Sequence, residues 1–157
     1  MATGFEGELH IILPLIIGFL IGLLEAYFVY EDENMTSGKD FLGDMWHGLL
    51  FCVGGTIIAT NTLWVFSLFT LPDFVQSLLF MDETGKSLVV SAIITLIMMT
   101  KMVASHAIKG VNSSGFKEKF WHKAVIALAV GFSPFYIFYL YDLIAPFAAY
   151  FPSWLPL

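Results

Sequence analysis

This 157-residue sequence has few charged residues and contains no arginine. Charged residues make up 13% of the chain, about half the share in an ordinary soluble domain. All seven basic residues are lysines and the net charge is −6, so the sequence offers no basic surface for nucleic acid. We therefore expect no nucleic-acid partner.

Cysteine and the motifs of soluble enzymes are also scarce. The single cysteine, Cys52, lies inside an apolar run and excludes an internal disulfide framework. The chain has no Walker loop and no GxGxxG, HExxH, GxSxG or CxxC motif. We do not expect catalysis by this chain alone, and no cofactor is implied.

Hydrophobic residues, in contrast, make up 58% of the chain and gather in four long runs. So short a chain cannot bury such runs on every side, so lipid must surround them. Each run holds the roughly 20 residues with which a helix crosses a hydrocarbon core about 30 Å thick. We predict an all-α integral membrane protein, a single domain over residues 1–157. Its transmembrane helices are expected at about 11–30, 46–71, 87–109 and 122–145, with short loops and an interfacial tail after them.

Lysine placement predicts the orientation of this bundle. Five lysines lie in or beside the first and third loops, namely Lys39, Lys109, Lys117, Lys119 and Lys123. Lys86 is alone on the opposite side. Because cytoplasmic loops hold the excess of basic residues, we expect a multi-pass protein of the cell membrane with both termini on the non-cytoplasmic side.

Three of the four runs carry a stripe of small or polar residues at helical spacing. The stripes are Leu15, Gly18, Gly22 and Glu25; His47, Gly54 and Asn61; and Ser91, Thr95, Met98, Met102 and His106. Each stripe lies on one helix face, which we expect to point inward. Gly18 and Gly22 form a GxxxG pair, so they and Gly54 are predicted to let neighbouring helices approach closely.

Antiparallel threading brings several ionisable side chains to the inner side of the bundle. They are Glu25, Asp44, His47, Lys101, His106 and His122. Glu25 and Lys101 lie at matching depth, so they can form an ion pair or take part in a proton relay. Asn61 and Asp142 would extend such a relay toward the outer side. Asp142 follows Ser133-Pro134, which predicts a kink near the middle of the fourth helix.

Some of the same residues could bind a metal or a haem. Asp44 and His47 are three residues apart, and His47 and His106 on facing helices could be the axial ligands of a haem. Met98 and Met102 could add soft ligands for copper. A structural role is the stronger explanation for them: Asp44 complements a helix dipole, His47 anchors the helix at the interface, and the methionines pack.

Together these features predict a small accessory or structural subunit of a larger membrane complex, such as a membrane oxidoreductase or monooxygenase whose metals lie in other chains. The expected partners are the lipid bilayer and other membrane subunits. One alternative is a homo-oligomeric transporter or channel for protons, ions or small solutes. A second alternative is a membrane anchor subunit that carries a haem or a metal.

Overall fold

The computed structural model describes residues 9–33, 38–68, 83–110 and 119–150. Their helices are α1 (Ile12–Glu33), α2 (Gly38–Thr60), α3 (Thr62–Ser67), α5 (Glu83–Gly110), α6 (Phe120–Gly131) and α7 (Ser133–Ile144), followed by the 3₁₀ helix η1 (Ala145–Tyr150). No strand occurs in these ranges. The prediction of an all-α chain is confirmed for the residues described.

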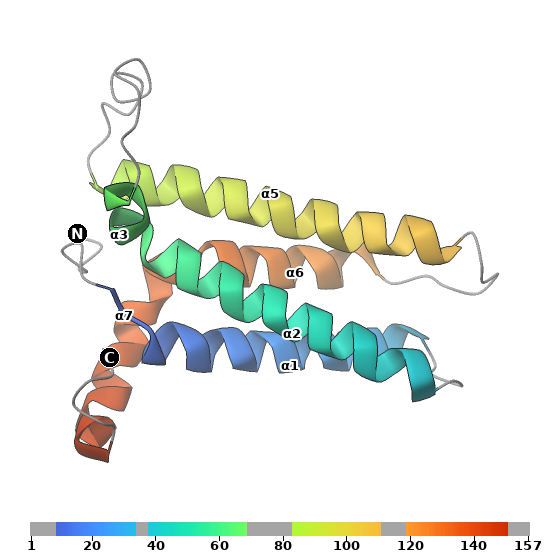
Figure 1. Cartoon of the computed structure of the whole chain (residues 1–157), viewed down its shortest axis with the longest axis horizontal. Coiled ribbons are helices and arrows are strands. Elements are labelled where there is room, and N and C mark those ends of the chain that lie inside the picture. Colours follow the sequence, from blue (N-terminus) through green and yellow to red (C-terminus); the bar gives the residue numbers. More distant parts are fainter. Residues whose placement is uncertain (1–8, 34–37, 69–82, 111–118, 151–157) are drawn as a thin grey trace.

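The helices α1, α2, α5 and α6 lie side by side with alternating directions (Figure 1). α1 and α5 run one way, and α2 and α6 run back between them. At the end where α1 begins, α3 continues from α2 and α7 turns away from α6. The ends of α1 and α5 and the starts of α2 and α6 therefore meet at the opposite end of the bundle.

Among the described residues, two helices are long and apolar enough to cross a membrane, over Ile12–Asp32 and Thr84–Ala104. The apolar helical stretches Met45–Thr60 and Phe120–Gly131 are shorter. The predicted segments 11–30 and 87–109 thus each correspond to one continuous helix. The other two predicted segments are interrupted.

The interruptions lie at Asn61 and Phe132. The helix predicted over 46–71 begins earlier, at Gly38, and is divided at Asn61 between α2 and α3. The helix predicted over 122–145 is divided at Phe132, where Ser133-Pro134 predicted a kink. A proline near the start of α7 is tolerated because its missing N–H is one that the first turn leaves unpaired in any case.

α1 and α2 are in direct contact at the two glycines of the GxxxG pair. A Cβ atom added to Gly18 would lie 2.6 Å from Val53 Cα, and one added to Gly22 would lie 2.9 Å from Leu49 Cα. Both distances are too short for any side chain. The absence of a side chain at Gly18 and Gly22 therefore lets the backbones of α1 and α2 meet.

Gly54 differs from its predicted role in helix packing. A Cβ atom added there meets nothing within 4 Å, whereas one added to the next residue, Gly55, would lie 2.6 Å from Val130 Cγ1 of α6. His47, predicted on the same inward stripe, is exposed. The inward face of α2 instead holds Gly48, Cys52 and Thr56, because contact with α1 at Gly18 and Gly22 sets the rotation of α2 about its axis.

The other two stripes point inward over most of their length. On α5, Ser91, Met98 and Met102 are buried. On α1, Gly18, Gly22 and Glu25 are buried, but Leu15 is 45% exposed.

The described helices bury polar side chains and expose large apolar ones. Glu25, Thr56, Asn61, Ser91, His122 and Ser133 are buried. Leu20 of α1, Ile58 of α2, Leu96 of α5 and Leu128 of α6 are each about half exposed or more. A surface of this kind is favourable against lipid and unfavourable against water.

Candidate functional site

The first polar cluster surrounds the carboxylate of Glu25 in the middle of α1. Cys52 of α2 donates its thiol hydrogen to Glu25 Oε2 over 3.1 Å. Lys101 Nζ of α5 lies 3.8 Å from Glu25 Oε1. The carboxylate also packs against Gly48, where an added Cβ would be 2.6 Å from Oε2. Three helices therefore meet around one buried negative charge.

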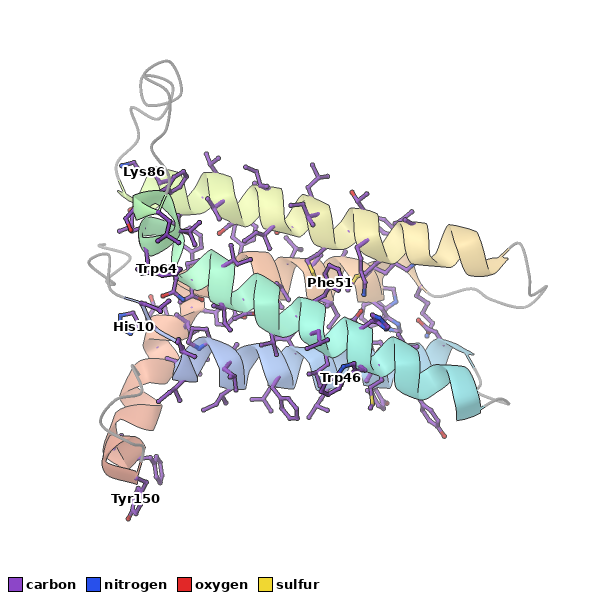
Figure 2. The ribbon with its side chains drawn as sticks, in the orientation of Figure 1. His10, Trp46, Phe51, Trp64, Lys86 and Tyr150 are labelled. Carbon is purple, nitrogen blue, oxygen red and sulfur yellow. The ribbon has the colours of Figure 1, made fainter. Side chains whose placement is uncertain are left out.

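Lys101 reaches this carboxylate from the edge of the bundle. Its side chain is 24% exposed, and its Nζ lies 4.8 Å from the centre of the Phe51 ring. Figure 2 shows Phe51 in the space between α2 and α5. The ammonium is thus placed between a carboxylate and an aromatic face, and both stabilise a positive charge. The structure brings Glu25 and Lys101 together; their role as a relay stays a prediction.

Asn61 is separated from this cluster. It lies nine residues beyond Cys52, about 14 Å further along the helix. Its amide binds backbone: Oδ1 accepts the His10 N–H over 2.6 Å, and Nδ2 donates to the carbonyl oxygens of His10 and Ile57 over 2.7 and 2.8 Å. Figure 2 shows His10 at the end of the bundle where α2 gives way to α3. Asn61 therefore holds the segment before α1 against the α2–α3 break.

The residues considered for metal or haem binding lie in different environments. His47 is on the exposed face of α2, and its Nδ1 lies 2.7 Å from the carbonyl oxygen of Gly43. Met98 and Met102 belong to the hydrophobic core, at 2% and 5% exposure. The side chains of Asp44, His106 and Asp142 are not among those that the structure describes. Among the side chains that the structure does describe, no three of His, Cys, Asp or Glu come together as a metal site.

A second polar cluster, which was not predicted from the sequence, joins the end of α1 to the start of α6. The carboxylate of Asp32 accepts the backbone N–H of Lys119 over 3.0 Å, and His122 Nδ1 lies 2.5 Å from the same Oδ2 atom. Lys119 Nζ lies 3.4 Å from Asp32 Oδ1. The negative charge at the N-terminus of α6 also complements the helix dipole.

Aromatic rings enclose the histidine of this second cluster. The His122 ring stacks on Phe28 at 4.0 Å with an angle of 2° between the planes, and Trp121 meets it edge-on at 3.8 Å. The side chains of His122 and Asp32 are 2% and 1% exposed. The carboxylate fixes the ring with its Nδ1 hydrogen toward Asp32, the arrangement that orients a histidine in many functional and structural sites.

One signal for this cluster was present in the sequence. The end of the first run and the start of the fourth lie on the same side of an antiparallel bundle, so the carboxylates of one and the histidine of the other are within reach. Three acidic residues, Glu31, Asp32 and Glu33, follow one another at that end of the first run. Only the rotation of α1 decides which of them faces α6.

Asp32→Ala is expected to lower the free energy of unfolding by about 2 kcal/mol, because it removes charge-assisted hydrogen bonds to Lys119 and His122. Glu31→Ala is the matched control. Glu31 is exposed and contacts Lys119 Nζ at 3.6 Å, so its loss should cost less than about 0.5 kcal/mol. Thermal unfolding of both variants in detergent measures the difference; equal effects would contradict a role for Asp32 in joining α1 to α6.

An apolar groove of about 510 Å³ lies between α2 and α5. It is lined by Leu50, Phe51, Gly54, Gly55 and Ile58 of α2 and by Val90, Ile93, Ile94, Ile97 and Met98 of α5. Every lining residue is apolar. The Phe51 ring lies at one end of the groove and is in cation–π contact with the ammonium of Lys101. The groove therefore adjoins the Glu25 cluster.

The chain matches no protein-family model, and no curated protein or solved structure matches it. Its possible functions are therefore those that its own residues support: two buried charge clusters that join helices, and an apolar groove beside one of them.

Proposed function

We propose that this chain crosses the membrane four times and serves as a non-catalytic accessory or structural subunit of a larger membrane complex. The four spans are α1, α2 with α3, α5, and α6 with α7. An oxidoreductase or monooxygenase whose metals lie in other chains is the kind of complex that this subunit would complete.

The observation that carries the proposal is the distribution of polar and apolar side chains. Each polar cluster joins different helices: Glu25 links α1 to α2 and α5, and Asp32 links α1 to α6. The outer faces of the same helices carry exposed leucines and isoleucines. Charges inside a membrane are costly unless they are paired, so paired interior charges and an apolar exterior favour a bundle surrounded by lipid and by other membrane subunits.

The use of the polar groups favours a structural role over a catalytic one. The Glu25 carboxylate already has Cys52 and Lys101 as partners, and the amide of Asn61 is fully engaged with backbone. Polar side chains that hold helices together in this way fix the position of the outer faces of those helices. A subunit of this kind would present its exposed helix faces to partner subunits.

The proposed orientation places both termini outside the cytoplasm. It rests on the excess of lysines in and beside the first and third loops, namely Lys39, Lys109, Lys117, Lys119 and Lys123. In intact cells, a cysteine in place of the exposed Tyr30 should not react with a membrane-impermeant thiol reagent added outside. It should react once the membrane has been permeabilised.

Extraction in a gentle detergent, followed by sizing and mass spectrometry, tests the subunit role. We expect the chain to sediment with membranes, to resist alkaline washing, and to elute with other membrane proteins at fixed stoichiometry. Elution as a homo-oligomer with no other protein would contradict the subunit role, and recovery in the soluble fraction would contradict membrane insertion.

A proton or ion transporter is the second candidate, and one observation favours it. Among the described side chains, the hydroxyls of Ser91 and Thr95 are buried without a hydrogen-bond partner. They lie on α5 beside Gly131, at the break between α6 and α7. Buried hydroxyls at a helix break are found where transporters bind ions. Flux into proteoliposomes separates this candidate from the subunit role.

A further inference from the structure

We infer that the groove between α2 and α5 holds one acyl chain of a phospholipid, whose phosphate lies beside Lys101. This inference rests on the proposed membrane insertion and adds a specific lipid site to it. Three features of the groove carry it: its chemistry, its length and the cation at one end.

The lining and depth of the groove suit a hydrocarbon chain. Its walls hold no polar side chain, and Gly54 leaves open space in the wall of α2 because nothing lies within 4 Å of its Cβ position. From Val90 to Met98 the groove follows α5 for about 12 Å at helical rise, which is less than half the thickness of a hydrocarbon core. A groove of this length fits within one leaflet.

Lys101 marks the headgroup end. It lies three residues beyond Met98, the last residue of α5 that lines the groove, so the cation is just past this end of the groove. At 3.8 Å its ammonium is too far from Glu25 to donate a hydrogen bond to it, so its hydrogens are available to a phosphate oxygen. The cation sits on Phe51, which itself lines the groove.

The test compares two leucine variants on the same helix. Gly54→Leu fills the groove, whereas Gly43→Leu adds the same side chain at an exposed position that also has nothing within 4 Å. Each protein is purified from membranes, exchanged into fresh detergent and incubated with phosphatidylcholine vesicles. Bound phospholipid is then counted by native mass spectrometry.

We expect the unmodified chain and Gly43→Leu to keep one phospholipid per chain, and Gly54→Leu to keep about tenfold less, because overpacking a filled site costs affinity. Equal retention by the two variants would overturn the inference. If the chain inserts into membranes but retains no phospholipid, the lipid site is wrong and the proposed function stands. If the chain does not enter membranes, both are wrong.

A photo-crosslinking residue in place of Ile93 gives a second readout that does not depend on how the leucine variants fold. Ile93 lines the groove and is 51% exposed, and Leu96, 68% exposed on the same helix but outside the groove, is the control position. The protein is irradiated after exchange into detergent, which removes the bulk lipid around exposed positions such as Leu96. We then expect a phospholipid adduct at Ile93 and none at Leu96. A protein adduct at Ile93 would overturn the inference in favour of a partner protein.

Discussion

Lys101→Met is expected to lower the free energy of unfolding by about 3 kcal/mol, because it leaves the buried carboxylate of Glu25 without a cation. Glu25→Gln should cost less, about 1–2 kcal/mol, because the partly exposed ammonium of Lys101 can turn toward the headgroups. Thermal unfolding in detergent measures both. The asymmetry between the two changes follows from their unequal burial.

The double variant Glu25→Gln with Lys101→Met is the decisive control. A neutral pair of similar shape leaves no unpaired charge, so most of the stability lost in Lys101→Met should return. Additive losses in the double variant would contradict the pairing and would mean that the two side chains act independently.

The same double variant separates the two candidate functions. As a structural subunit, the neutral pair should still assemble with its partner chains. As a transporter that uses Glu25 and Lys101, it should lose all flux even though it is folded. Normal assembly together with normal flux would contradict a relay through these two residues.

Gly18→Ala is expected to destabilise the bundle by about 1–3 kcal/mol, because the new methyl group would overlap the backbone of α2. The atom in its way is Val53 Cα, at 2.6 Å, and no rotation of a side chain can relieve the contact. α1 and α2 would have to move apart. Loss of helix contact can be measured as a lower thermal midpoint in detergent.

Gly54→Ala is the matched control for this change. Its methyl group would meet nothing within 4 Å, and alanine favours a helix interior over glycine by about 0.5–1 kcal/mol. The control should therefore be neutral or stabilising. If Gly54→Ala were as harmful as Gly18→Ala, the packing of α1 on α2 would not depend on the GxxxG glycines.

The sequence by itself determined the all-helical class, the approximate position of the first and third predicted helices and the tight contact at the GxxxG pair. These features depend on local composition and spacing, since apolar runs, glycines four apart and a proline act through their own neighbours. The contact between Glu25 and Lys101 could also be predicted from their matching depth in the membrane, because a charge at that depth of a bundle has few other partners.

Tertiary structure decided how each helix is rotated and where the polar groups find partners. Gly54 and Gly55 are adjacent, so their directions differ by about 100° around the axis, and only packing on α1 and α6 shows that Gly55 makes the contact. Asn61 was expected in mid-helix, but its amide satisfies the backbone of His10, a residue 51 positions away. Of the three neighbouring acidic residues, Asp32 joins α1 to α6, because among the described contacts it alone hydrogen-bonds both Lys119 and His122. Such partners are distant in sequence, and no local pattern can specify them.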